Sequence, residues 1–172
     1  MGGINSVGGY MLLEQHLKRV ERHFLQRKRI QSMVDDIKAE RVAKKELTGG
    51  ARHAFISDPT AITAIKNVAP IISIKIDMGV YEMTVFHPED WLAVIDATYL
   101  LHKNQLTGTA MWARCEEGKS PAVVWGLMGI SERCYYNWRE EFLSDAIVLA
   151  IEKGLIVFNK TEAEKSAIHD VK

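Results

Sequence analysis

The 172-residue sequence has few cysteines and no long hydrophobic run, and these two absences exclude several classes of protein. Two cysteines, Cys115 and Cys134, are too few for a disulfide framework and suit a reducing compartment. The longest run of apolar or glycine residues is Ala122–Ile130, far shorter than the roughly 20 residues that span a bilayer. No basic segment followed by an apolar stretch opens the chain, so we expect no secretory signal. We therefore expect a cytoplasmic protein with no membrane partner.

The patterns that mark catalytic and cofactor-binding sites are also missing. There is no Gly-rich phosphate loop and no Gly-x-Ser-x-Gly nucleophile turn. The cysteines lie 19 positions apart, without the Cys-x-x-Cys or His-x-x-x-His spacing of zinc ligands. His16 and His23 fall seven positions apart without further ligands, which is typical of packed or solvated histidines. We expect no enzymatic activity, no catalytic residue, no metal and no cofactor.

Charge of one sign is not in excess overall, but it is unevenly distributed. The chain has 22 basic and 22 acidic residues. Residues 1–56 hold 11 basic and 6 acidic residues, whereas residues 57–172 hold 11 and 16. This asymmetry indicates a basic arm joined to a mildly acidic body. It fits either a solvated basic helix or an arm that contacts nucleic acid.

Residues 10–47 contain neither glycine nor proline and carry a narrow apolar stripe. The stripe has the 4-3-4 spacing of a coiled-coil seam, breaks at Arg27–Arg29 and then resumes. Its positions are Leu13, Leu17, Val20 and Phe24 before the break, and Ile30, Met33, Val34 and Ile37 after it. The pattern predicts one long helix or two, and the stripe needs a partner, either another chain or the body of the same chain.

The middle of the chain predicts a short helix, a β-hairpin and a longer helix. Thr48–Gly50 should end the first helical region, and a short helix is expected around Ala61–Val68. Apolar residues then alternate with polar ones from 72 to 76 and from 81 to 85, around a turn at Asp77–Gly79. A helix should begin at His87–Asp90. Its expected buried stripe is Trp91, Leu92, Ile95, Thr98, Tyr99 and His102.

The most informative stretch is Thr107–Leu143. Ser120 and Pro121 are typical of a helix start, and Gly129 should end that helix after about two turns. Ser131 should then cap a second, amphipathic helix. Two turns of helix, a glycine turn, a serine cap and an amphipathic helix are the pattern of a helix-turn-helix.

Helical spacing divides the second helix of this motif into two sides. Ile130, Tyr135 and Trp138 should face the core, against Trp125 and Met128. The residues that should point outward are Glu132, Arg133, Tyr136 and Asn137. Arginine pairs with guanine, asparagine with adenine, and glutamate accepts from cytosine, so these four are the predicted base-reading residues, with tyrosine adding an apolar or phosphate contact.

A second set of residues is predicted to contact DNA phosphates. Four lie near the ends of the two helices, where phosphate contacts usually set the register, and three lie in the basic arm. They are Lys119, Ser120, Ser131 and Arg139, together with Arg27, Lys28 and Arg29.

Two features favour the alternative that this is an ordinary pair of packed helices whose polar face meets water. The position four residues before the turn glycine is usually small, whereas here it is Trp125, and we interpret the neighbouring Gly126 as relieving the crowding. Glu140 and Glu141 also follow the predicted recognition segment. Because non-specific DNA affinity is mostly electrostatic, the motif alone should bind weakly, and the arm or a second subunit would have to add contacts.

Three segments carry a resemblance to a known family. They are GGARHAFISDPTAITAIKN, PEDWLAVIDATY and EGKSPAVVWGLMGISERCYYNWREEFL. With the charged N-terminal helix, they make the chain resemble phage-encoded transcriptional regulators of the ArpU/RinA type, whose C-terminal region is sigma-factor-like. The resemblance implies a sequence-specific regulator in a bacterial host cell. It places the recognition helix at Ser131–Trp138 and the preceding helix at Pro121–Met128.

We therefore predict a mainly α protein with a small β-hairpin, a long N-terminal helix and a C-terminal helix-turn-helix domain. The predicted divisions are 1–50 (basic coiled-coil-like helix), 51–87 (linker helix and hairpin), 88–158 (helical domain, with the helix-turn-helix at about 120–140) and 159–172 (loose tail). The predicted function is transcriptional regulation through double-stranded DNA, as a homodimer or larger homo-oligomer, with host RNA polymerase as a candidate further partner. Two alternatives stay open: a phage small terminase subunit that binds DNA as a ring, and a protein-docking module without DNA binding.

Overall fold

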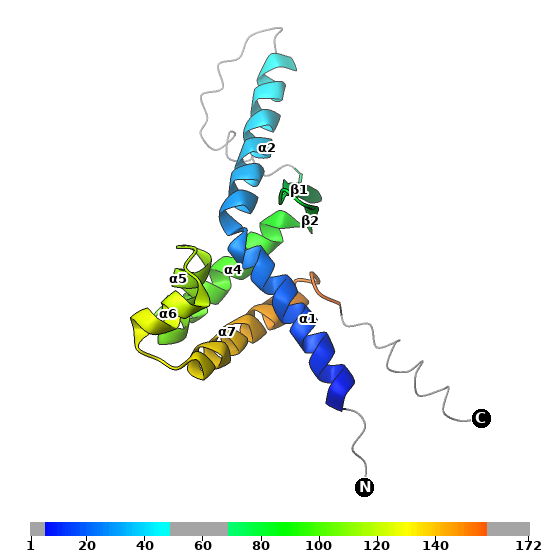
Figure 1. Ribbon diagram of the computed structural model, residues 1–172. Coiled ribbons are helices and arrows are strands. Elements are labelled where there is room, and N and C mark those ends of the chain that lie inside the picture. The colour runs from blue at the N-terminus through cyan, green and yellow to red at the C-terminus, as the bar shows by residue number, and fades with distance from the viewer. Residues whose placement is uncertain (1–5, 49–68, 158–172) are drawn as a thin grey trace, which may run out of the picture.

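The computed structural model describes residues 6–48 and 69–157, with side chains described for 14–43 and 69–157. Its elements are α1 (Ser6–Leu25), α2 (Arg27–Thr48), β1 (Ser73–Asp77), β2 (Glu82–Phe86), α4 (Pro88–Leu101), α5 (Leu106–Cys115), α6 (Pro121–Met128) and α7 (Glu132–Glu152). Figure 1 shows α1 beside α7, while the far half of α2 extends away from the other helices. The predicted class, mainly helical with a small antiparallel hairpin, is confirmed. The predicted helix at 61–68 and the predicted tail at 159–172 lie outside the described residues.

The N-terminal region forms two helices that meet at Gln26. The Gln26 amide donates to the carbonyls of Arg22 and His23, at 3.0 and 3.2 Å, and its own carbonyl accepts from the Ile30 amide. The turn therefore falls one residue before the predicted break at Arg27–Arg29. Of the two predicted arrangements, one helix or two, the structure has two.

The predicted hairpin forms, but each strand lies one residue later than predicted, and Ile72 and Tyr81 are exposed just before the strands. Strands β1 and β2 pair antiparallel, with Ile74 opposite Val85. The Asp77 carboxylate accepts from the Gly79 amide at 2.7 Å, and Gly79 takes a left-handed conformation with φ of 84°. Ile74, Ile76 and Val85 are buried, so one face of the hairpin covers the helical core. This burial supplies the apolar contact that an isolated hairpin lacks.

Helix α4 begins where predicted, directly after the hairpin. His87 precedes it in a left-handed conformation, and its amide donates to the Ile72 carbonyl at 2.8 Å. Pro88 occupies the first helical position, where no amide hydrogen is needed. At the other end, His102 is 2% exposed and lies between Gln105 Oε1 and Asp145 Oδ2, each 2.9 Å from a ring nitrogen. The contact between His102 and Asp145 connects the end of α4 to α7.

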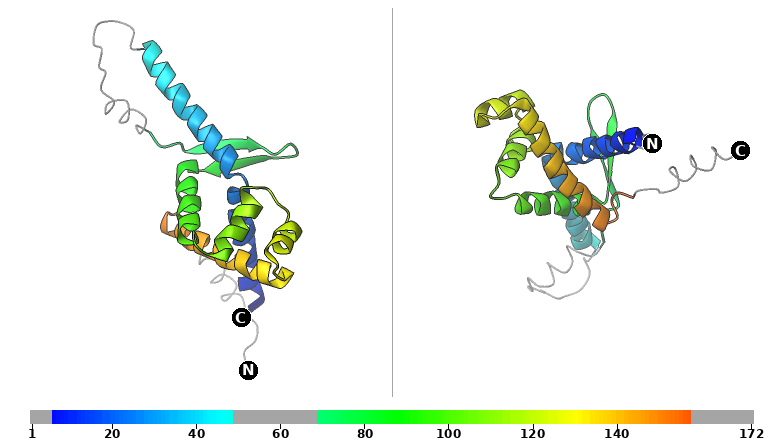
Figure 2. Two further views of the ribbon diagram at one scale, coloured as in Figure 1. Left: turned by 90° about the vertical axis from the view of Figure 1, so that its left-hand side faces the viewer. Right: turned by 90° about the horizontal axis from the view of Figure 1, so that it is seen from below.

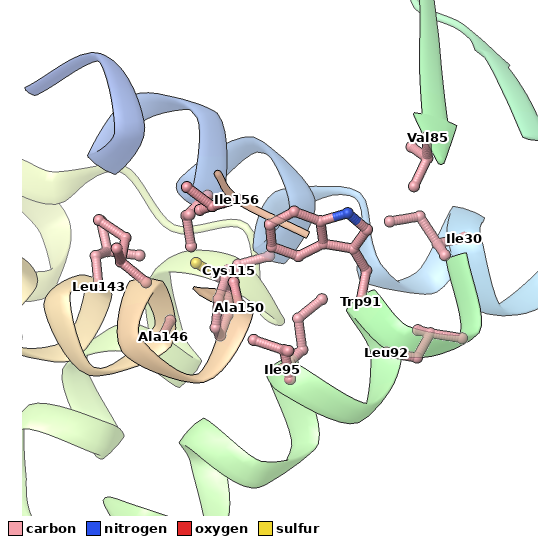
Figure 3. Packing of buried hydrophobic residues seen from close by; sticks show 14 of the residues in the cluster. Ile30, Val85, Trp91, Leu92, Ile95, Cys115, Leu143, Ala146, Ala150 and Ile156 are labelled. Atoms are coloured by element: carbon pink, nitrogen blue, oxygen red, sulfur yellow. The ribbon is translucent and has the colours of Figure 1, made fainter. Parts of the chain in front are cut away.

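One hydrophobic cluster joins α1, α2, the hairpin, α4, α5 and α7. Figure 3 shows Trp91 at its centre, with Ile30 and Val85 on one side and Ala150 and Ile156 on the other. A second, smaller cluster joins α5, α6 and α7. Its buried members are Ala110, Val124 and Tyr135, with Ala113, Trp125, Met128, Ile130 and Trp138 packed around them.

The apolar stripe of α1 and α2 finds its partner within the chain. Leu17, Val20, Phe24 and Ile30 are each 3% exposed or less and belong to the main cluster. The Phe24 ring contacts the ring of Phe142 edge-on, with 5.3 Å between their centres. Of the two partners that the sequence left open for the stripe, the body of the same chain is therefore the one present.

In the part of the chain that the structure describes, every helix is too short or too polar to cross a membrane.

Candidate nucleic-acid interface

Helix α6 has the boundaries that its capping residues predict. The Ser120 hydroxyl accepts a hydrogen bond from the Val123 amide at 3.4 Å, and Pro121 takes the first helical position. Gly129 ends the helix in a left-handed conformation with φ of 64°. The turn then closes through the Ile130 amide, which donates to the Trp125 carbonyl at 3.1 Å.

Helix α7 begins directly after this turn. The Ser131 hydroxyl accepts from the Cys134 amide at 3.2 Å, so the predicted serine cap is confirmed. Figure 2 shows α6 and the N-terminal half of α7 at one end of the molecule, joined by this short connection. The two caps leave only three residues between the helices, Gly129–Ser131, so the N-terminal turns of α7 stay next to α6.

The predicted division of α7 into two sides is confirmed. Tyr135 is 1% exposed, and Ile130 and Trp138 are half-buried in the smaller cluster. The side chains on the outward side are all exposed: Glu132, Arg133, Tyr136 and Asn137. The α7 helix thus presents an acid, a guanidinium, an aromatic ring and an amide to the surroundings on successive turns.

Trp125 is accommodated by packing on aromatic rings of α7. Its ring lies 6.0 Å from Tyr135 and 6.3 Å from Tyr136, measured between ring centres. A Cβ atom at Gly126 would meet no atom within 4 Å. The interpretation that Gly126 relieves crowding beside Trp125 is therefore wrong, because nothing approaches that position closely.

The predicted phosphate-contacting residues at the helix ends differ in what they already bind. Ser120 and Ser131 use their hydroxyl oxygens as caps, and both side chains are exposed. The Lys119 ammonium lies 2.5 Å from a Glu117 carboxylate oxygen. Arg139 is paired most closely: its Nε and Nη2 donate to both Glu21 oxygens, at 3.1 and 2.7 Å.

The Arg139 side chain is only 13% exposed, and that of Glu21 only 16%. The hydrogen bonds to Glu21 raise the pKa of Arg139 above its usual value, so the guanidinium stays charged. Arg139 therefore holds α7 against α1, and its donors point away from the exposed side that carries Arg133.

The three basic residues of the predicted arm lie at the junction of α1 and α2 and bind the body. Arg27 donates to the Asp96 carboxylate at 2.7 Å, Lys28 to the Glu116 carbonyl at 2.6 Å, and Arg29 to the Asp77 carbonyl at 3.2 Å. Burial lowers the pKa of Arg27, but the hydrogen bond and charge of Asp96 raise it more, leaving it above its usual value. Arg27 and Lys28 also lie 3.8 and 4.0 Å from the buried Glu116 carboxylate.

A pocket of about 430 Å³ beside the outward side of α7 could not be foreseen from the sequence. It is formed by α1, α5, α6 and α7, and Tyr136 lines it together with Arg114. The Tyr135 hydroxyl and the Arg114 Nε have no hydrogen-bond partner among the described residues. Three glutamates line it as well: Glu14, Glu21 and Glu140. No sequence signal marks this pocket, because α1 reaches α7 only through the tertiary fold.

Nothing in the described part of the chain assembles a metal site, and the Cys115 thiol is not activated. Residues 14–43 and 69–157 contain no group of three or more His, Cys, Asp or Glu side chains that could hold a metal ion. Burial raises the pKa of the Cys115 thiol to about 12, so it remains protonated at neutral pH. A protonated, buried thiol is a poor nucleophile.

Comparisons with known protein families, with curated proteins and with solved structures found no match to this chain.

Proposed function

We propose that this protein is a sequence-specific DNA-binding transcriptional regulator that reads double-stranded DNA with the N-terminal half of α7. The observation that carries the proposal is the exposure of Glu132, Arg133, Tyr136 and Asn137 on the side of α7 opposite the buried Tyr135. The opposite side of α7 packs against α6 in the smaller cluster, and this packing holds in place the part of the helix that carries the four side chains.

Each of the four side chains has a defined use in the major groove. The Arg133 guanidinium can donate two hydrogen bonds to a guanine, and the Asn137 amide can pair with an adenine. Glu132 can accept from a cytosine, and Tyr136 can pack on a thymine methyl or reach a phosphate. The resemblance to ArpU/RinA-type regulators agrees with this assignment.

The residues of the proposed interface that are available to contact phosphates lie at its edge. Arg139 is held by Glu21, which leaves Lys119, Ser120 and Ser131 as the nearest candidates on α6 and α7. Weak non-specific affinity is then expected, since that affinity depends on phosphate neutralisation. A homodimer would add a second recognition helix, but it would have to pair through a surface other than the buried stripe of α1.

The test is selection from a randomised duplex library with the full chain, at about 50 and about 200 mM salt. The wild type should enrich a defined motif at both salt concentrations. The Arg133→Ala/Asn137→Ala variant should lose that motif. Lys103→Ala/Asn104→Ala is the matched control, because it removes the same charge and the same amide from exposed positions elsewhere. Enrichment of no motif by the wild type, or equal loss in the control, would overturn the proposal.

The size of the DNA-bound particle separates the regulator from a small terminase subunit. A dimer on each site supports the regulator, whereas a ring of about eight or more chains supports the terminase. Light scattering of the complex measures this directly.

A second candidate function, a protein-docking surface, is favoured by the charge around α7. With Arg139 paired, the exposed charged residues at the start of α7 are Arg133 against Glu132, Glu140 and Glu141. Such a face suits a basic protein surface, for example one on host RNA polymerase, better than a phosphate backbone. If the library selection fails while Glu132→Gln/Glu140→Gln/Glu141→Gln abolishes binding to purified RNA polymerase, this candidate replaces the first.

A further inference from the structure

A small pocket of about 220 Å³ lies between α1, β2 and the start of α4, and it shares no lining residue with α6 or α7. Its lining includes Arg19, Arg22 and His23 from α1, Thr84 and Phe86 from β2, and Trp91 from α4. These three elements meet near the junction of α1 and α2 (Figure 2). We call it the Arg19–Arg22 pocket.

The two arginines of this pocket differ from Arg27 and Arg139 in their charge partners. Arg19 and Arg22 are exposed, lie one helical turn apart, and form no ion pair with any described residue. No acidic residue lines the pocket. By contrast, Arg27 and Arg139 both donate to carboxylates. Two neighbouring guanidiniums without a carboxylate form a concentration of positive charge that an anion can neutralise.

The floor of the pocket is formed by two stacked rings. The rings of His23 and Trp91 stack with 3.9 Å between centres and 13° between planes. Both side chains are at most 3% exposed, and His23 Nδ1 donates to the Arg19 carbonyl at 2.8 Å. Burial lowers the pKa of His23 to about 4, so at neutral pH the ring is uncharged and the positive charge belongs to the guanidiniums.

The rim of the pocket adds a hydroxyl group and an aromatic ring. The Thr84 side chain is exposed, and its hydroxyl can donate to an anionic oxygen. The Phe86 ring is 57% exposed although it is a large apolar group on a strand. An exposed aromatic ring next to two guanidiniums offers a stacking surface beside a charge partner, which is the combination that proteins use to hold nucleotides.

We propose that the Arg19–Arg22 pocket binds the phosphate of a nucleotide, with both guanidiniums on the phosphate oxygens and the attached sugar or base against Phe86. The nucleotide is either a free 5′-nucleotide or one unit of a nucleic-acid strand, since both present the same group. The site is separate from the outward side of α7 and does not depend on base reading there.

The test is a titration of the isotope-labelled full chain, followed by NMR through the backbone amides of residues 19–23 and 83–86. The probes are inorganic phosphate, 5′-AMP and a short duplex DNA. 5′-AMP or the duplex should shift these amides saturably and bind more tightly than inorganic phosphate. The Arg19→Gln/Arg22→Gln variant should weaken this binding by about tenfold or more, because two charge-assisted contacts are lost.

The matched control is Arg41→Gln/Lys103→Gln, which removes two positive charges from exposed positions outside the pocket and should bind as the wild type does. Unchanged amide spectra away from the pocket show that both variants fold. No saturable shift with any probe, equal weakening in the control, or no preference for 5′-AMP or duplex over inorganic phosphate overturns the proposal.

The same titration distinguishes a free nucleotide from a nucleic-acid strand, and the Arg19–Arg22 pocket from the outward side of α7. Saturation by 5′-AMP identifies a free nucleotide. A response to the duplex alone identifies a strand, and Arg19→Gln/Arg22→Gln should then lower the slope of log affinity against log salt by about 2. The Arg133→Ala/Asn137→Ala variant should keep the response of the pocket to 5′-AMP, so failure of base reading leaves this result standing.

Discussion

His23 shows how one buried side chain couples the stability of the protein to pH. Its ring is 3% exposed and stacks on Trp91, so a proton on the ring would place a charge inside the main cluster. Burial lowers the pKa of His23 from 6.5 to about 4 in the folded chain, although its hydrogen bond to the Arg19 carbonyl acts in the opposite direction. The folded state therefore disfavours the proton that the unfolded chain accepts.

We expect the free energy of unfolding to fall as pH drops from about 6.5 to about 4, by up to roughly 3 kcal/mol from this residue. In that window the unfolded chain binds a proton at residue 23 and the folded chain does not. Urea unfolding at a series of pH values measures the effect. His23→Phe keeps a flat ring against Trp91 and should lose this share of the pH dependence. An identical pH dependence in both proteins would contradict the assignment.

Replacing each of two helical glycines by alanine should change the stability of the protein in opposite directions. In α6, a Cβ at Gly126 meets no atom within 4 Å, so Gly126→Ala should raise stability by roughly 0.5–1 kcal/mol through helix propensity. In α5, a Cβ at Gly108 would lie 2.2 Å from the His102 carbonyl oxygen, so Gly108→Ala should cost about 1–3 kcal/mol. Thermal unfolding of both variants measures the pair. Destabilisation by Gly126→Ala would show that α6 needs glycine at this position.

At the scale of elements, the contact between α1 and α7 combines apolar packing with one buried ion pair. Leu17, Val20 and Phe24 supply the apolar part. Arg139 and Glu21 supply the ion pair, with two hydrogen bonds and both side chains largely buried. Removing one partner leaves the other charge without its counterion, which is the costly way to break such a pair.

Arg139→Gln should therefore lower the free energy of unfolding by roughly 2 kcal/mol. The double variant Arg139→Gln/Glu21→Gln should lose less unfolding free energy than the sum of the two single variants. The second substitution removes the charge that the first leaves without a partner. Lys18→Gln is the control, since it breaks the exposed pair with Glu14 and should leave stability nearly unchanged. Urea unfolding of the wild type, the two single variants and the double variant gives the coupling free energy between Arg139 and Glu21. Additive losses would show that the pair contributes little to the contact between α1 and α7.

At the scale of the molecule, the N-terminal helices belong to the same core as the rest of the described chain. Buried residues of α1 and α2 pack in one cluster with those of the hairpin, α4, α5 and α7. The basic residues at the junction of α1 and α2 also bind acidic side chains and carbonyls of the body. Part of the charge asymmetry between the two halves of the sequence is thus neutralised within the fold.

A chain that lacks residues 1–48 should consequently lose cooperative thermal unfolding. Without Phe24 and Ile30, the rings of Trp91 and Phe142 would be exposed to water on one side. Circular dichroism during heating measures the transition. A sharp transition in the shortened chain would show that the body folds alone and that α1 and α2 are an appended arm.

The local features of this protein follow from its sequence alone. The caps at Ser120 and Ser131, the turn at Gly129 and the two sides of α7 follow from residues within a few positions of one another. The hairpin and the start of α4 follow from the same kind of signal. Such signals act through hydrogen bonds and backbone preferences that are complete within one or two turns of chain.

How these elements pack against one another is visible only in the folded chain. The α1 stripe fits a partner chain or the body equally well, and Arg139 looks like a free cation until α1 brings Glu21 to it from 118 positions away. The Arg19–Arg22 pocket likewise needs α1, β2 and α4 to converge. Contacts between distant positions depend on which apolar faces pack together, and local sequence patterns carry no information about that choice.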